Sequence, residues 1–141
     1  MSTPRPDDAA ALPAVRVGVD VVEVARVTRL LAEQPGIEQT LFTPGELAYC
    51  SGRRRRDEHL SGRFAAKEAV LKAFGTGLGT RMRWTDVEIV NAWGGRPRVD
   101  LHGEVAAVAD RRGLLDLDVS LSHTSSLAVA QAVAIWRHDQ G

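Results

Sequence analysis

The alternation of apolar and polar residues predicts three β-strands, one near the start of the chain and two at its end. In the segment 15–21, valines alternate with Arg16, Gly18 and Asp20, which is the period of a half-buried strand. Two further strands are predicted over 116–122 and 127–136. The last strand places four alanines on one face, and such a flat face suits close packing of a helix.

Helical periodicity and capping residues predict the elements between these strands. Asp20 resembles an N-cap with Glu23 as the third helical residue, which predicts a helix over about 20–34. Thr43 followed by Pro44 predicts a short helix to about residue 51. Three more elements are predicted further along: a long helix over 58–74, a hairpin over 84–93 and 96–101, and a helix over 103–112.

This order of elements favours an α+β fold, with helices packed on one side of a mostly antiparallel sheet. The length of 141 residues is typical of one domain. We expect this domain to cover 14–138. The segment 1–13 contains three prolines, two adjacent aspartates and an alanine cluster, and it is predicted to be a disordered leader.

Composition limits the class of protein further. No apolar run approaches the roughly 18 residues of a membrane span, and the N-terminus has no signal-peptide pattern. Cys50 is the only cysteine, which suits a reducing compartment. We therefore expect a cytoplasmic protein that binds no membrane. Net charge is zero, but residues 51–75 carry seven basic against three acidic groups. This local excess indicates an anionic partner rather than a nucleic-acid coat.

Two carboxylates are candidates for a metal site. Asp20 projects from the polar face of the first predicted strand, where Gly18 would leave the space beside it empty, and Glu68 lies on the long predicted helix. Mg²⁺ prefers one or two carboxylates together with phosphate oxygens and waters. Structural roles are equally open at this point, since Asp20 could cap a helix and Glu68 could form an (i, i+4) ion pair with Lys72.

The long predicted helix also carries a basic set formed by Arg63, Lys67 and Lys72. Lys67 falls in the middle of the apolar stripe, so it must extend to solvent, pair with an acid or face a site. A glycine-rich loop starting at Gly75 follows the helix. Because a P-loop precedes its helix, this loop is not one. Its glycines either end the helix or permit close backbone approach to an anionic ligand.

The remaining candidates are a histidine and several arginines. His123 ends a predicted strand, where side chains often reach ligands, although a lone histidine there is more often structural. A serine hydrolase is disfavoured because no G-x-S-x-G elbow is present. Arg26 and Arg29 share one face of the first predicted helix. The block 53–56 is interpreted as a solvated loop in preference to a docking surface for an acidic protein.

Taken in order, several segments make the chain resemble the holo-acyl-carrier-protein synthase family over about residues 15–136. The segment Gly62-Arg63-Phe64-Ala65-Ala66-Lys67-Glu68-Ala69 is the most diagnostic of them. The others are Gly18-Val19-Asp20-Val21-Val22-Glu23, Phe42-Thr43-Pro44-Gly45-Glu46, Lys72-Ala73-Phe74-Gly75-Thr76-Gly77-Leu78-Gly79, Trp84-Thr85-Asp86-Val87-Glu88-Ile89, Gly95-Arg96-Pro97 and Val119-Ser120-Leu121-Ser122-His123.

The resemblance implies that the chain is a homotrimer with active sites at its subunit interfaces. It assigns Mg²⁺ to Asp20 and Glu68, and catalysis to Glu68 and Lys72. Carrier-protein docking falls to Arg26, together with Arg29 and Leu30 on the same helix. Residues expected near coenzyme A are Arg63, Lys72, Gly75, Thr76, Gly77, His123 and Thr124.

The reaction implied is attack by a serine of an apo acyl carrier protein on the β-phosphate of coenzyme A. The 4′-phosphopantetheine group is transferred and 3′,5′-ADP leaves. Lys72, with Arg63 or Lys67, would add positive charge where the leaving group becomes more negative, and the base is either Glu68 or a metal-bound water. The carrier could serve fatty acid, polyketide or peptide synthesis. A different class remains open: a module that binds coenzyme A or a carrier without chemistry.

Overall fold

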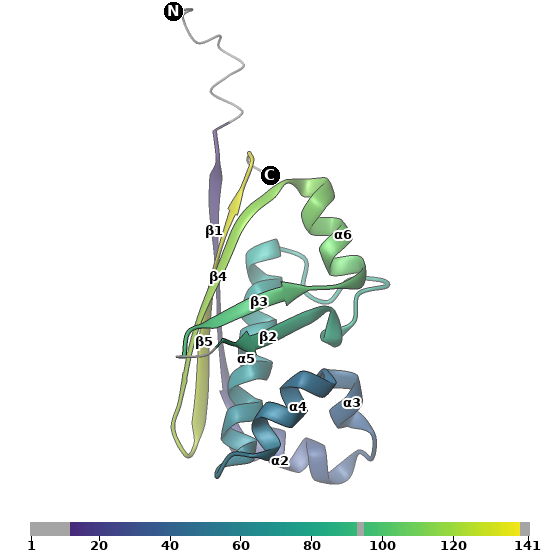
Figure 1. Cartoon of the computed structure of the whole chain (residues 1–141), viewed down its shortest axis with the longest axis vertical. Helices are drawn as coiled ribbons and strands as arrows, with labels where there is room; N and C mark the ends of the chain where they lie inside the picture. Colours follow the sequence, from purple (N-terminus) through teal and green to yellow (C-terminus); the bar gives the residue numbers. More distant parts are fainter. Residues whose placement is uncertain (1–11, 93–94, 139–141) are drawn as a thin grey trace, which may run out of the picture.

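In the computed structural model, which describes residues 12–92 and 95–138, three long antiparallel strands form the main sheet and one long helix lies along it (Figure 1). The strand order is β1-β5-β4. A separate two-stranded antiparallel sheet joins β2 and β3. The bounds of the strands are β1 Ala14–Glu23, β2 Val87–Asn91, β3 Pro97–Leu101, β4 Leu114–His123 and β5 Leu127–Trp136.

Helices occupy one side of the main sheet. The helices α2, α3 and α4 gather around one end of α5, while α6 lies toward the other end of the molecule (Figure 1). A 3₁₀ turn, η1, leads into β2. The bounds are α2 Val24–Glu33, α3 Ile37–Leu41, α4 Pro44–Ser51, α5 Arg56–Phe74, η1 Trp84–Asp86 and α6 Gly103–Arg112. The predicted α+β class with antiparallel strands is confirmed.

The core forms where α5 packs on β1 and β5. The inner face of β5 consists of Ala128, Ala130, Ala132 and Ala134, each at most 1% exposed. This confirms that the alanine face packs a helix. Gly18 brings β1 equally close, because a Cβ built there would lie 1.9 Å from the Ala69 carbonyl oxygen. The prediction of empty space beside Gly18 was therefore wrong: the backbone of α5 fills it.

The predicted alternation in β1 is correct, but the valines lie on the outer face. Val15, Val17, Val19 and Val21 are 50–58% exposed, and Leu127 and Val129 of β5 are exposed with them. Arg16, Gly18 and Asp20 alternate with the valines and so point to the side of the sheet that holds α5. Helices cover one face only, which leaves an apolar outer face on the main sheet.

The predicted N-cap at Asp20 was wrong. β1 continues to Glu23, which pairs with Leu127 of β5, and α2 begins only at Val24. The cap prediction at Thr43 is confirmed by a complete capping box with Glu46. The short helix α3 was not predicted, because five residues carry too little periodicity.

The predicted hairpin is confirmed as β2 and β3, but residues 84–86 form a 3₁₀ turn instead of strand. Trp93, the last residue of the first predicted strand, and Gly94 of the expected Gly94-Gly95 turn lie outside the described residues. Nearly all of the predicted leader, residues 1–11, also lies outside them. None of the described helices is sufficiently long and apolar to cross a membrane. The cytoplasmic location stays a prediction.

Candidate active site

A cavity of about 480 Å³ lies between β1, α2 and α5, and it contains both predicted metal ligands. Asp20 enters from β1, whereas Glu68 and Lys72 enter from α5. Arg26 and Leu30 of α2 also line the cavity. The structure thus brings together residues from three elements that the sequence singled out separately.

Lys72 is bound to β1 instead of to its helical neighbour. Its Nζ donates to Asp20 Oδ1 at 2.9 Å and to the Val19 carbonyl oxygen at 2.9 Å. The hydrogen bond to Asp20 raises the pKa of the Lys72 ammonium group. The proposed Glu68–Lys72 ion pair is replaced by a Lys72–Asp20 pair.

Glu68 lies half-buried beside these two charges. Burial raises the pKa of its carboxyl group, and the neighbouring negative charge of Asp20 raises it further, while Lys72 acts in the opposite direction. The Asp20 carboxylate, from a separate element, therefore disfavours the charge on Glu68 in the same cavity. A bound cation relieves such repulsion.

The oxygen donors suit a hard cation to which the protein supplies only some of the ligands. In the segments 12–92 and 95–138, no group of three or more His, Cys, Asp or Glu side chains could enclose a metal ion. Two carboxylates at a solvent-open cavity match Mg²⁺, which keeps waters and takes phosphate oxygens from a ligand. Asp20 and Glu68 would hold it.

A second cavity, of about 360 Å³, adjoins the first through Lys72. Gly75 and Thr76 line it after the end of α5, together with the basic residues Arg16 and Arg112. Gly75 has φ 79° and ends the helix, a conformation that glycine adopts without strain. Gly77 also has positive φ, but it does not line this cavity.

Lys67 does not face the candidate site. It is fully buried, and its Nζ donates to Glu46 Oε1 at 2.6 Å and to the carbonyl oxygens of Trp84 and Val87. These three acceptors use all three ammonium protons. The suggestion that Lys67 adds charge at the reaction centre was therefore wrong. Of the three alternatives for this lysine, pairing with an acid is the one observed.

Arg63 lies apart from the carboxylates, on another side of α5. It is 2% exposed, donates to Asn91 Oδ1 and stacks its guanidinium 4.1 Å from the centre of the Tyr49 ring. Within the part of the chain that the structure describes, its Nε has no hydrogen-bond partner. Arg63 and Tyr49 line a third cavity, of about 150 Å³.

His123 lies at the end of β4, beside the first turns of α5. Its Nδ1 is 3.3 Å from Glu58 Oε1, and its ring centre is 4.7 Å from that of His59. Burial lowers the pKa of the His59 ring, and the nearby His123 contributes in the same direction. His123 and Thr124 do not line the cavity that holds Asp20 and Glu68.

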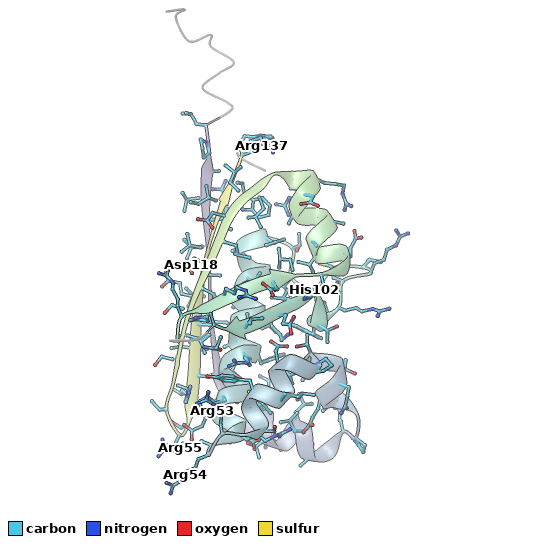
Figure 2. All side chains as sticks on the ribbon, viewed as in Figure 1. Arg53, Arg54, Arg55, His102, Asp118 and Arg137 are labelled. Carbon is cyan, nitrogen blue, oxygen red and sulfur yellow. The ribbon has the colours of Figure 1, made fainter. Side chains whose placement is uncertain are left out.

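The arginine block is only partly a solvated loop. Arg53 lies 4.3 Å from the centre of the Tyr49 ring, and Arg56 forms a 2.8 Å ion pair with Glu38 of α3. Arg54 and Arg55 are exposed and extend away from the ribbon (Figure 2). Arg29 is exposed on α2 but, unlike Arg26, does not line the main cavity.

The sequence analysis missed several residues that contact the candidate site residues. Glu46 was noted only within a motif, although it is the buried partner of Lys67. Glu58, His59 and Tyr49 were not singled out at all. Their contacts join residues ten to 65 positions apart, and no local pattern encodes such a contact.

Comparison with known proteins gives a consistent result. Residues 16–132 match the 4′-phosphopantetheinyl transferase superfamily. The holo-[acyl-carrier-protein] synthase of Moorella thermoacetica is 44% identical over 119 residues, which cover 84% of this chain and 92% of the relative. The corresponding protein of Desulforudis audaxviator is 48% identical over 121 residues, covering 84% and 91%.

Solved structures agree with the sequence comparison. An ACPS–CoA complex from Chronobacterium ammoniagenes superimposes with a TM-score of 0.80 at 30% identity, covering 87% of this chain and 98% of that one. The Helicobacter pylori AcpS in complex with coenzyme A gives a TM-score of 0.73 at 25% identity, covering 84% and 98%.

Proposed function

Because this chain belongs to the 4′-phosphopantetheinyl transferase superfamily and is a holo-[acyl-carrier-protein] synthase, we propose that it transfers 4′-phosphopantetheine from coenzyme A to a serine of an apo acyl carrier protein in a Mg²⁺-dependent reaction. The second product is 3′,5′-ADP. The observation that carries this proposal is the convergence of Asp20, Glu68 and Lys72 in one open cavity.

Asp20 and Glu68 are the proposed Mg²⁺ ligands. When bound, the ion would neutralise charge on the pyrophosphate of coenzyme A. Lys72 is placed to bind an anionic group beside the carboxylates, since its Nζ reaches the Asp20 carboxylate from a half-exposed side chain. Fixed positive charge at that point stabilises a leaving phosphate as its charge increases.

Coenzyme A is proposed to extend from this cavity to the glycine loop. Gly75 and Thr76 line the adjoining cavity with two arginines, a composition that suits phosphate groups. Gly77 follows in the same loop. We keep Arg63, His123 and Thr124 as coenzyme A contacts. None of them lines the two cavities around Lys72, so His123 and Thr124 would act on the ligand of a neighbouring subunit, whereas the buried Arg63 would act through the third cavity, which it lines.

The division of the proposed coenzyme A contacts between two chains favours a homotrimer with active sites between subunits. The apolar outer face of the main sheet supports the proposal, since an exposed face of this kind marks an interaction surface. A neighbouring chain packed on this face would bring its own coenzyme A contacts toward the cavity that holds Asp20 and Glu68.

The partner proposed for α2 is the apo acyl carrier protein, of fatty acid or polyketide type. Arg26 and Leu30 line the main cavity together with the carboxylates, so a carrier bound there would have its serine near Lys72. Arg29 is exposed on the same helix and would contribute to attraction of an acidic surface at longer range.

Mass spectrometry of an apo carrier incubated with the protein, coenzyme A and Mg²⁺ tests this function. The carrier should gain the mass of phosphopantetheine. Asp20→Ala and Glu68→Gln should each reduce the rate by at least about a hundredfold while melting temperature stays close to that of the unmodified protein. A folded protein that binds coenzyme A but modifies no carrier from a panel of fatty acid, polyketide and peptide types would instead be a binding module.

A further inference from the structure

A buried carboxylate faces His123 from the first turn of α5. Glu58 is only 8% exposed, and its Oε1 lies 3.3 Å from His123 Nδ1. Its other oxygen, Oε2, is 3.7 Å from Nε of Arg55, a side chain that is mostly exposed. An exposed pair of this kind contributes little, so the buried contact of Glu58 is the one with His123.

The surroundings of His123 leave its ring little freedom. Gly62 lies one helical turn after Glu58, and a Cβ built on it would lie 2.9 Å from Leu121 Cδ1 and 3.9 Å from His123 Cδ2. The glycine thus makes room for Leu121, and the His123 ring lies beside it at an ordinary contact distance from the helix. His59 closes another side, with ring planes at 70° and centres 4.7 Å apart.

We propose that Glu58 is a positioning residue for His123, accepting a hydrogen bond from Nδ1–H so that Nε2 faces away from α5, toward bound coenzyme A. This inference rests on the proposed function, in which His123 contacts coenzyme A. A carboxylate can only accept a hydrogen bond, so its contact with Nδ1 selects the tautomer that carries the proton there. Histidines that bind ligands are commonly oriented by such a partner on the other ring nitrogen.

A merely structural role for Glu58 is the competing explanation. An acidic residue in the first turn of a helix also stabilises the helix dipole, and Glu104 occupies the same kind of position in α6. The partner of Glu104 is Arg111, at 3.1 Å. Glu104→Gln is therefore the matched control for Glu58→Gln.

The first test is independent of activity. ¹⁵N NMR of the histidine side chains at alkaline pH reports which nitrogen carries the proton. His123 should have the proton on Nδ1 in the unmodified protein, and Glu58→Gln should shift the population toward the Nε2–H form. Glu104→Gln should leave the signal unchanged. A neutral His123 protonated mainly on Nε2 in the unmodified protein would overturn the proposal without any variant.

The second test is a double-mutant cycle on transfer kinetics. Glu58→Gln should raise KM for coenzyme A about tenfold, at the lower end of what outer partners of ligand-binding histidines contribute, with KM for the carrier nearly unchanged. In a His123→Ala background the same substitution should have no further effect, because Glu58 acts through His123. Equal effects of Glu58→Gln with and without His123 would contradict the proposal.

The two tests separate this inference from the proposed function. If the unmodified protein transfers no phosphopantetheine, the proposed function fails, whereas the NMR result still decides whether Glu58 orients His123. If transfer is normal but His123→Ala leaves KM for coenzyme A unchanged, the positioning role is wrong and the transferase function stands.

Discussion

At the scale of single residues, the location of Arg26 leads to a prediction about carrier binding. Arg26 lines the cavity that holds Asp20 and Glu68, and its side chain is exposed. Charged groups at an interface rim steer association, and the effect weakens as salt rises. Arg26→Glu should therefore raise KM for the carrier at least about tenfold at low salt, since it replaces attraction with repulsion. Arg26→Ala should have a milder effect.

Steady-state kinetics at low and moderate salt would measure this difference, with KM for coenzyme A as an internal reference. Arg111→Glu is a suitable control, because it reverses an exposed arginine on α6, at the other end of the molecule from α2 (Figure 1). An unchanged carrier KM for Arg26→Glu, insensitive to salt, would exclude α2 as the docking helix.

The two lysines of the chain show how far residue types alone can identify a site. Both lie on α5, five positions apart, and both were candidates on sequence grounds. Lys72 reaches Asp20 at the cavity, whereas Lys67 is enclosed by Glu46 and two carbonyl oxygens. What distinguishes them is the packing of α4 and η1 against one side of α5. That packing is a tertiary property, which helical periodicity does not contain.

At the scale of elements, the Lys67–Glu46 pair joins four segments of the chain. Glu46 of α4 accepts from Thr43 N, Ile89 N of β2 and Lys67 of α5, while Lys67 also donates to the carbonyl oxygen of Trp84 in η1. Both side chains are fully buried. The pair therefore fixes α5, and with it Glu68, relative to the second sheet.

Removing one partner of this pair should destabilise the fold strongly. Lys67→Ala leaves the Glu46 charge buried without a counterion, which costs about 3–5 kcal/mol of unfolding free energy. Lys72→Ala, on the same helix, removes a pair whose lysine is half-exposed, worth at most about 1 kcal/mol. Urea unfolding of both variants measures the difference. The double variant Glu46→Leu with Lys67→Met should be more stable than Lys67→Ala alone, and equal losses for the two single lysine variants would refute this account.

The boundary between β1 and α2 shows why one element was predicted with the wrong limits. Asp20 and Glu23 have the spacing of a capping box, yet β1 continues through both because β5 supplies backbone partners up to Leu127. Backbone hydrogen bonding between β1 and β5 thus outweighed the local capping signal at Asp20. β5 itself was predicted with the observed limits, since its alternation continues without interruption to the turn.

At the scale of the whole molecule, the two faces of the main sheet differ in how they are covered. The inner face holds small residues against α5, and the outer face carries the valines of β1 with Leu127 and Val129 of β5. The register places Val17 opposite Val133 and Val21 opposite Val129, so the apolar side chains of neighbouring strands are adjacent. The sequence pattern predicted the two faces of β1 and of β5 but not which face of β1 the helix would cover, because Gly18 decides that.

The apolar outer face leads to the last prediction, that the chain is a trimer through this surface. Light scattering should give about three times the 15.3 kDa mass of one chain. Val17→Glu places a charge in the middle of the outer face and should yield folded monomers, because burying an unpaired charge opposes association. Transfer activity should fall with assembly, since His123 would no longer reach the cavity of a neighbour. Gln39→Glu adds the same charge at an exposed position of α3 and should leave both mass and activity unchanged. A fully active Val17→Glu monomer would show that each chain has a complete site, and the division of coenzyme A contacts between subunits would then be wrong.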